Sequence, residues 1–551
     1  MKTVVAAAIG ECVHVAGVVN FLRLADKVGW RTIFIGPATP IEQIIETAAA
    51  EQADLVGVSY RLTPENGERL IASFAEQADH LKNQGVKFAF GGPPPMAAKA
   101  RKMGFFDACF DGSETTEGVI AFLKGQPTDT QSITDFPQKT IERIQWKSPM
   151  PLIRHHFGLP DLEATRRGIE EIAESRMVDV ISLGIDQDAQ ENFFNPERQD
   201  KRRFGAGGVP VRTAEDYSRL FAASRTGNYP LMRTYSGTDN FFRLAEMYVE
   251  TINIAWAAVP LFWFNRMDGR GPWDLEGSIR EHQQLMAWYG ERNIPVEANE
   301  AHHWGMRDAH DVVFIVSAYL AACNAKAVGV KDHIIQLMFN SPPGTSAAMD
   351  IAKMLAVIEM VSPLASPNFR IWKQVRTGLL SYPVDLTQAR AHLAVSVFNQ
   401  MQIRPDIVHV VGYPEADHAV TATEVVESCI IARKAIDDAL HSKFELTATK
   451  NIQQRVCELV QEAELLVEAI KQSGSQTSDD PLADPGVLAT AVTSGLLDAP
   501  QLINNPYGRG EFPTTYDHRG ACQPMDKNTR EIISESERIQ RIQSRRKDEQ
   551  N

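Results

Sequence analysis

The sequence predicts an α/β protein in two parts, a flavodoxin-like (Rossmann-like) domain followed by a (β/α)8 TIM barrel with a C-terminal extension. Three observations predict this fold. Short apolar, β-branched runs alternate with amphipathic helical patterns over the first 125 residues. A polar segment without periodicity follows them. The alternation then resumes and gives eight strand–helix units, the number that a TIM barrel requires.

The first domain, residues 1–125, contains five predicted strands. They are Val4–Ile9, Arg31–Ile35, Leu55–Ser59, Val86–Phe90 and Ala108–Asp111. Amphipathic segments lie between them, notably 41–51 and 65–83. Five strands joined by helices are typical of a doubly wound parallel sheet, which binds its ligands at the carboxyl ends of the strands.

Residues 126–150 are polar, contain proline and lack periodicity, so we expect a linker there. The predicted barrel occupies residues 151–472, and the extension occupies residues 473–551. The eight predicted barrel strands are 151–155, 178–185, 230–236, 257–264, 295–301, 327–333, 369–375 and 407–411. The main helical patterns are 239–251, 274–291, 311–326, 347–361, 386–400 and 423–441.

Composition narrows the class of protein. The hydrophobic share of 44% and the charged share of 23% are those of an ordinary globular protein. A net charge of −14 opposes binding to nucleic acid and to anionic membranes. The six cysteines lie far apart without a CxxC pair, which argues against a disulfide framework or a structural zinc site. This use of cysteine fits a reducing cytoplasm, and the most apolar stretch, 252–264, is too short to span a bilayer.

Three segments with chemical character follow strands of the first domain. The segment 10–17, GECVHVAG, comes directly after the first strand and opens a helix. Ser59-Tyr60-Arg61 follows the third strand, and Gly91-Gly92 follows the fourth. The carboxyl ends of parallel strands share one edge of the sheet, and glycine allows a bulky group to approach the backbone. We therefore expect a ligand site at this edge.

These segments resemble the cobalamin-binding domains of the mutases, whose pattern is DxHxxG, then SxL after the third strand and GG after the fourth. The resemblance implies that His14 is the lower axial ligand of the cobalt. Cys12 stands where the family has the aspartate that orients this histidine, and Arg61 replaces the leucine. The predicted cofactor-binding residues are His14, Gly17, Ser59, Tyr60, Gly91, Gly92 and Cys12.

The barrel segment resembles, in collinear order, the catalytic component of glutamate mutase (methylaspartate mutase). The matching segments include 151–154 (PLIR), 184–186 (GID) and 410–416 (VVGYPEA). That family binds its substrate's two carboxylates with three arginines, because a guanidinium fork gives bidentate recognition. The first arginine is kept as Arg154, and the second falls on Gln190. The third falls on Tyr235, with Arg233 two residues away.

Other family positions also differ here. The fourth strand offers no carboxylate for a substrate amine, so the resemblance implies a less polar acid in a more apolar pocket near Trp256, Phe262 and Trp263. Glu415 matches a glutamate that holds the ribose of the adenosyl group, while Val411 occupies the position of the companion lysine.

Two further clusters lie near predicted strand ends. His302, in the segment 299–304 after the fifth strand, is a candidate polar substrate contact or acid–base group. A metal site formed with Asp308 and His310 is the alternative. The segment 331–333 (KDH) is a candidate catalytic-face set, and it is equally compatible with a structural role.

The resemblance implies an adenosylcobalamin-dependent carbon-skeleton mutase, a radical isomerase that acts on a small carboxylic or amino acid other than glutamate and forms a homodimer. Two alternatives stay open. A cobalamin-binding methyl carrier or cobalamin-responsive protein without mutase activity is favoured by Val411 and the altered arginines. A barrel enzyme that has lost the cofactor is favoured by Cys12 and Arg61. The expected partner is a small-molecule acid, with neither nucleic acid nor membrane.

Overall fold

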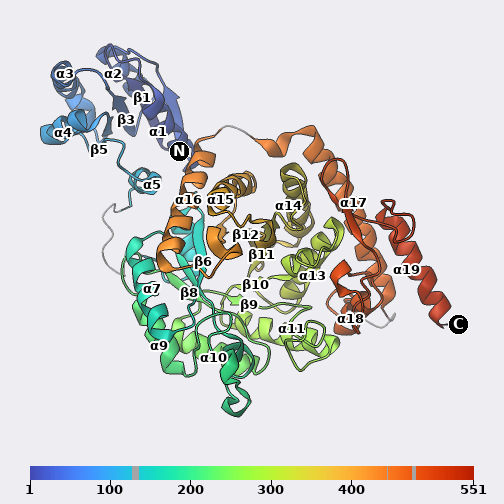
Figure 1. The fold of residues 1–551 in the computed structure, drawn as a ribbon. Helices are drawn as coiled ribbons and strands as arrows, with labels where there is room; N and C mark the ends of the chain where they lie inside the picture. The colour runs from blue at the N-terminus through green and yellow to red at the C-terminus, as the bar shows by residue number, and fades with distance from the viewer. Residues whose placement is uncertain (127–135, 443–444, 475–478, 551) are drawn as a thin grey trace. The chain divides into compact units, whose positions relative to one another are not determined.

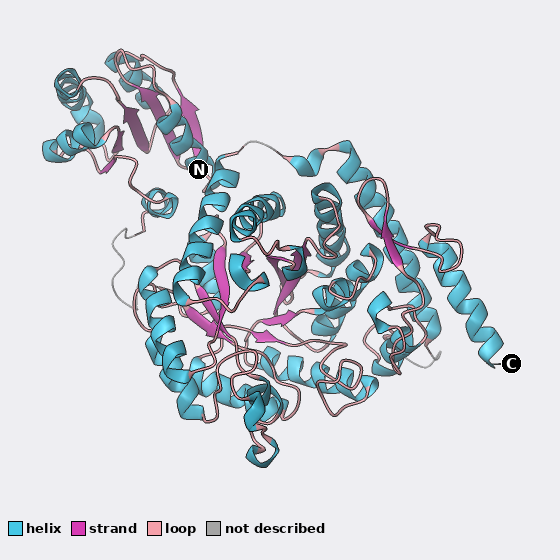
Figure 2. Ribbon diagram, in the orientation of Figure 1, coloured by secondary structure: helices cyan, strands magenta, loops and turns pink. Residues whose placement is uncertain are grey.

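The computed structural model describes residues 1–126, 136–442, 445–474 and 479–550. The chain forms two units, one centred on residues 1–126 and the other on residues 151–439 with the C-terminal segment. Helices surround the strands in both units (Figure 2). No helix in the described ranges is long and apolar enough to cross a membrane.

The N-terminal unit is a five-stranded parallel sheet in the order β2-β1-β3-β4-β5 (Figure 1). The strands are β1 (Thr3–Ala8), β2 (Arg31–Phe34), β3 (Leu55–Ser59), β4 (Lys87–Gly91) and β5 (Ala108–Phe110). The helices are α1 (Ala16–Lys27), α2 (Ile41–Ala50), α3 (Pro64–Asn83), α4 (Pro94–Met103) and α5 (Thr116–Lys124). This order confirms the predicted flavodoxin-like fold, whose chain reverses direction across the sheet between β1 and β3.

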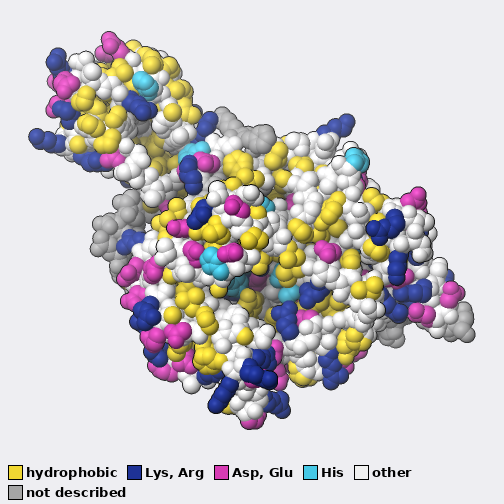
Figure 3. Space-filling view, in the orientation of Figure 1, with side chains coloured by type: hydrophobic (Ala, Val, Ile, Leu, Met, Phe, Trp, Pro, Cys, Tyr) yellow, Lys and Arg dark blue, Asp and Glu magenta, His cyan; other side chains and the backbone are white. Residues whose placement is uncertain are grey.

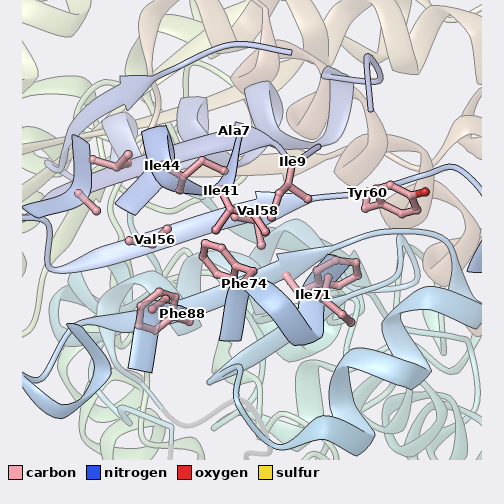
Figure 4. Packing of buried hydrophobic residues seen from close by; sticks show 14 of the residues in the cluster. Ala7, Ile9, Ile41, Ile44, Val56, Val58, Tyr60, Ile71, Phe74 and Phe88 are labelled. Atoms are coloured by element: carbon pink, nitrogen blue, oxygen red, sulfur yellow. The ribbon is translucent and has the colours of Figure 1, made fainter. Parts of the chain in front are cut away.

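One face of this sheet carries a dense apolar core. Ile44 of α2 and Phe74 of α3 pack with Val56 and Val58 of β3, as Figure 4 shows. Phe74 also meets Phe88 edge to face, with ring centroids 5.9 Å apart. The core thus joins α2, α3 and α4 to one face and leaves α1 and α5 to cover the other.

The larger unit is a nearly closed parallel barrel of eight strands in the order β8-β7-β6-β13-β12-β11-β10-β9. The strands are β6 (Leu152–Phe157), β7 (Val180–Leu183), β8 (Leu231–Arg233), β9 (Ala257–Ala258), β10 (Val296–Ala298), β11 (Asp332–Phe339), β12 (Arg370–Thr377) and β13 (Ile407–Val410). At the seam between β8 and β9, the backbone N–H of Ala255 donates to the carbonyl of Met232. The architecture is that of a TIM barrel, as predicted.

Helices enclose this barrel and match most of the predicted patterns. They are α7 (Leu162–Ser175), α8 (Gln187–Glu191), α9 (Ala214–Ala223), α10 (Phe241–Ile252), α11 (Leu275–Glu291), α12 (Glu300–Gly305), α13 (Asp311–Ala327), α14 (Ala347–Val361), α15 (Leu386–Gln400) and α16 (Ala422–His441). Asp161 and Asp274 cap the amino ends of α7 and α11 by accepting backbone N–H groups. These caps explain why the two helices begin where the sequence changes from turn residues to an apolar pattern.

The predicted sixth strand, 327–333, is wrong. Helix α13 continues to Ala327, and Gly329 then turns the chain with φ +84°, so the strand begins only at Asp332. The segment 331–333 therefore lies at the amino end of β11, opposite to the catalytic face. There Asp332 accepts two hydrogen bonds from the guanidinium of Arg370 at 2.7 Å, which is a structural role.

The predicted linker contains a helix, α6 (Thr140–Lys147). Ile144 of this helix packs with Leu152, Val180 and Ile407 in the apolar layer at the amino end of the barrel. The buried guanidinium of Arg143 donates to the carbonyls of Asn228 and Tyr229. The pattern was missed because one short amphipathic helix among polar residues gives too few turns for a periodic signal.

The C-terminal segment packs on the barrel helices. It contains α17 (Lys450–Ser473), α18 (Pro485–Thr493), β14 (Thr514–Tyr516), β15 (Cys522–Pro524) and α19 (Glu535–Gln550). Arg455 of α17 pairs with buried Asp311 at 3.4 Å, and buried Arg538 of α19 pairs with Glu535. The first pair ties α17 to α13, and Arg538 ties α19 to the preceding segment by donating to the carbonyls of Gly495 and Leu496.

Candidate functional site

A cavity of about 830 Å³ opens at the carboxyl edge of the N-terminal sheet, and we call it the sheet-edge cavity. It lies on the face of the sheet that α1 and α5 cover. Phe21 and Leu24 of α1 give it an apolar wall, and Gly57 of β3 forms part of its floor. Lined by small and apolar groups, it can take a bulky ligand with few charges.

Six of the seven residues predicted to bind a cofactor line this cavity: His14, Gly17, Ser59, Tyr60, Gly91 and Gly92. The side chain of His14 is exposed, as a group that meets an incoming ligand requires. The ring of Tyr60 belongs to the apolar core with Ile71 and Met96. Arg61 also lines the cavity and is exposed.

Cys12, the seventh residue, does not line the cavity. It is fully buried in the core, and its Sγ lies 4.0 Å from Nδ1 of His14. That separation is at the outer limit of a hydrogen bond to sulfur. The thiol therefore lies beside the histidine, where the resemblance places an aspartate, but holds it only weakly.

Three details describe the packing around the sheet-edge cavity, where the resemblance places the nucleotide tail of a cobalamin. The Ser59 Oγ is buried without a hydrogen-bond partner in the described chain and can donate to a polar atom of a ligand. A Cβ added at Gly17 would meet nothing within 4 Å, so open space adjoins the helix there. A Cβ added at Gly92 would lie 2.6 Å from the carbonyl oxygen of Tyr60, so only glycine allows this close backbone packing.

A second cavity of about 270 Å³ lies in the barrel unit, and we call it the barrel cavity. Five of the six predicted catalytic residues line it together: Arg154, Gln190, Arg233, Tyr235 and His302. Arginine, lysine and histidine side chains gather around a hollow in this unit (Figure 3). Its small volume limits a ligand to a small molecule.

The guanidinium of Arg154 is held by protein acceptors on every side. Its Nε donates to Ser182 Oγ at 2.6 Å. Its Nη1 donates to Gln374 Oε1 at 2.8 Å and to Glu297 Oε2 at 3.2 Å, and its Nη2 lies 3.1 Å from His156 Nε2. Burial lowers the pKa of Arg154 to about 9, so it remains charged at neutral pH.

Glu297, at the centre of β10, is the buried counter-charge of this network. Its Oε2 accepts from Trp256 Nε1 at 2.6 Å and lies 3.7 Å from Nη1 of Arg233. Its Oε1 accepts from Gln336 Nε2 at 3.3 Å. Burial raises the pKa of Glu297, but Arg154 and Arg233 outweigh it and bring the pKa to about 2.

Two arginines of the barrel cavity keep unused donors. Nε and Nη1 of Arg233 are buried without a hydrogen-bond partner in the described chain, and so is Nε of Arg376. Within the described ranges, no carboxylate pairs with Arg376. Guanidinium donors that are left without a hydrogen bond beside a cavity are suited to bind an anion.

The histidines of the cavity are neutral. Burial lowers the pKa of His302 and of His303 well below the usual value, and the positive charge of Arg376 lowers it further. Their rings lie 4.2 Å apart between centroids. Neutral imidazoles can donate or accept hydrogen bonds without adding charge to a substrate site.

Glu415 does not line the barrel cavity. Its Oε1 accepts from the backbone N–H of Gly412 at 2.6 Å within a turn, 413–416. Burial raises its pKa, although the Gly412 N–H and the charge of Arg376, which does line that cavity, act in the opposite direction. The carboxylate is thus engaged by its own turn.

The prediction of an apolar substrate pocket is wrong for this cavity. Phe262 and Trp263 are fully buried in the protein interior and do not line it. The metal alternative is also not supported, since no group of three or more His, Cys, Asp or Glu side chains in the described ranges could hold an ion.

Sequence reasoning missed four polar residues on three strands. They are Glu297 on β10, Gln336 on β11, and Gln374 and Arg376 on β12. The available signal was a polar residue flanked by apolar ones in the middle of a buried strand. In a barrel, such a position faces the interior and needs a partner there.

Comparison with known proteins bears on the first domain. Residues 2–121 match a family described as the B12 binding domain. The chain therefore contains a cobalamin-binding domain. No curated protein matches the chain.

Two solved structures are similar at low identity. One is a novel cobalamin-binding protein from Desulfitobacterium hafniense DCB-2, at 21% identity and a TM-score of 0.20, over 22% of this chain and 58% of that one. The other is the cobalamin-dependent S-adenosylmethionine radical enzyme OxsB, at 12% identity and a TM-score of 0.17, over 80% of this chain and 56% of that one. With TM-scores this low, neither likeness supports a conclusion about this chain.

Proposed function

We propose that this chain is an adenosylcobalamin-dependent carbon-skeleton mutase, a radical isomerase that acts on a small carboxylic or amino acid other than glutamate. The observation that carries the proposal is the barrel cavity, where Arg233 and Arg376 keep donors without a hydrogen bond, in a chain that also contains a B12-binding domain. A homodimer, which the resemblance to glutamate mutase implies, is part of the same proposal.

Adenosylcobalamin, when bound, supplies reversible hydrogen-atom abstraction from carbon. His14 would hold the cobalt from its exposed loop, and Ser59 Oγ would donate to the nucleotide tail. Arg233 and Arg376 would hold the acid group of the substrate. Arg233 and Glu297 are almost fully buried, which strengthens the electrostatic contacts that they make.

The test is reconstitution of the full chain with adenosylcobalamin, followed by absorption and EPR spectroscopy. We expect a histidine-ligated cobalamin spectrum that His14→Ala loses and that His80→Ala, on exposed α3, retains. Addition of the substrate acid should produce a cob(II)alamin radical signal. Equal spectra for the two variants would contradict the role of His14, and absence of cobalamin uptake would overturn the proposal.

A second candidate is a cobalamin-binding methyl carrier or cobalamin-responsive protein without mutase activity. The position of Glu415 favours it, because this carboxylate is bound to Gly412 and does not line the barrel cavity. Under this alternative, methylcobalamin and adenosylcobalamin bind equally well, and no acid produces a radical signal.

A further inference from the structure

The charges around the barrel cavity are unequal. Four arginines line it, Arg154, Arg233, Arg270 and Arg376, and within the described ranges Glu297 is the one carboxylate that does so. Arg270 is neutralised by Asp268, whose Oδ2 lies 3.1 Å from its Nε. Glu297 is shared by Arg154 and Arg233. The cavity therefore keeps an excess of positive charge.

Glu297 has no negative charge left over for a substrate cation, because two guanidiniums already share it. Its Oε2 already faces Arg154, Trp256 and Arg233, and its Oε1 accepts from Gln336. A substrate ammonium in this cavity would face Arg376, which has no carboxylate partner in the described chain, and Arg154 and Arg233, which share one carboxylate. Like charges a few ångströms apart in a poorly solvated site repel strongly, so the cavity discriminates against an ammonium group.

The cavity does offer neutral hydrogen-bond acceptors. Because Nε2 of Gln336 donates to the carboxylate of Glu297, its amide orientation is fixed and Oε1 is left over. Gln336 Oε1 and Asn299 Oδ1 are both buried without a partner in the described chain. An uncharged hydroxyl can donate to either atom, which removes the cost of leaving them unpaired.

We propose that the barrel cavity takes a small hydroxycarboxylate that carries no ammonium group. Its carboxylate pairs with the guanidiniums of Arg233 and Arg376, and its hydroxyl donates to Gln336 or Asn299. This inference rests on the proposed function, since it names the substrate class of the same site. It excludes the amino acids that the resemblance to glutamate mutase left open.

Isothermal titration of the full chain with malate, aspartate and succinate tests this inference. Malate and aspartate share one carbon skeleton and differ in a hydroxyl against an ammonium group. We expect malate to bind at least tenfold more tightly than aspartate, and several-fold more tightly than succinate, which has neither group. Aspartate binding as tightly as malate, or no binding of any of the three, would overturn the inference.

Two variants test whether malate binds in the barrel cavity. Arg376→Met, at a half-buried position, should weaken malate binding at least tenfold, whereas Arg202→Met, whose side chain is 90% exposed, should leave it unchanged. Circular dichroism verifies that both variants fold. Equal malate affinities for the two variants would also overturn the inference.

The titrations are independent of cobalamin. Malate selectivity without any cobalamin spectrum would refute the proposed function and leave the cavity assignment standing. A normal histidine-ligated spectrum without malate binding would refute only the assignment of the substrate class.

Discussion

The sheet-edge cavity and the barrel cavity solve opposite physical problems. The first is made by the absence of side chains, at Gly17, Gly91 and Gly92, with an exposed histidine at its rim. The second is made by buried charges, in which Glu297 balances Arg154 and part of Arg233. The comparison teaches that a site made by open space, as at Gly17, can be altered without cost to the fold, whereas a charge-lined site is part of what stabilises its domain.

Removal of the Glu297 charge should give the largest effect on the free energy of unfolding. In Glu297→Gln, Arg154 and Arg233 lose their shared counter-charge inside the barrel. Breaking a buried pair in this way costs about 3–5 kcal/mol, to be measured as the free energy of unfolding in urea. The control Glu163→Gln, at a half-exposed ion pair with Arg166, should cost less than about 1 kcal/mol.

The carboxylate of Glu297 also makes the stability of the protein depend on pH. Since the pKa of Glu297 is lowered from 4.5 to about 2, its contribution to stability is present above pH 4.5 and is lost as the pH falls toward 2. Glu297→Gln should lack this acid-dependent loss. If the variant and the unaltered protein lose stability in parallel over this range, the buried network does not require the charge.

A second buried glutamate in the barrel, Glu300, differs from Glu297 in its pKa. Glu300, on α12, accepts from the backbone N–H groups of Leu261 and Phe262, and its Oε2 is buried without a partner in the described chain. Burial raises its pKa to about 8, although these two N–H groups act in the opposite direction. At neutral pH, Glu300 is therefore protonated in the folded protein, while Glu297, three residues earlier, is ionised.

The second prediction concerns Glu300→Gln. A raised pKa means that the stabilisation is fully present below the ordinary value of 4.5 and is lost as the pH rises through about 8. The uncharged glutamine escapes this loss, which amounts to at most about 1.4 kcal/mol per pH unit. We expect urea unfolding at pH 5 and pH 8 to show that the free energy of unfolding of the variant increases relative to that of the unaltered protein as the pH rises. A constant difference at the two pH values would contradict the assignment.

The two cavities also differ in how far sequence predicts them. The sheet-edge site could be predicted because its residues follow strands at fixed places in the strand order, so local motifs are enough. In the barrel, the predicted positions of Arg154, Arg233 and His302 meet in one cavity. Their partners could not be predicted, since Glu297 and Arg154 are 143 residues apart and meet only when the barrel closes.

The sixth strand shows a further limit of the sequence. Helix α13 is apolar on almost every face, and the apolar run 327–330, which begins at its last residue, fits the start of a strand equally well. Hydrophobic periodicity cannot place a boundary inside such a run. Gly329 marks the boundary through its positive φ, a property that becomes visible only in the folded backbone.

The smallest effect on stability should come from Gly17→Leu, which tests whether the sheet-edge cavity can be filled without cost. A Cβ at Gly17 meets nothing within 4 Å, and the residue lies in α1, where glycine is less favourable than other residues by about 0.5–1 kcal/mol. We expect unchanged or slightly higher stability, together with at least tenfold weaker cobalamin binding in absorption titrations. Ala49→Leu, on an exposed face of α2, should leave cobalamin binding unchanged. Normal cobalamin affinity in Gly17→Leu would show that the ligand lies elsewhere. Lower stability would show that the space beside Gly17 belongs to the packed core and not to a site.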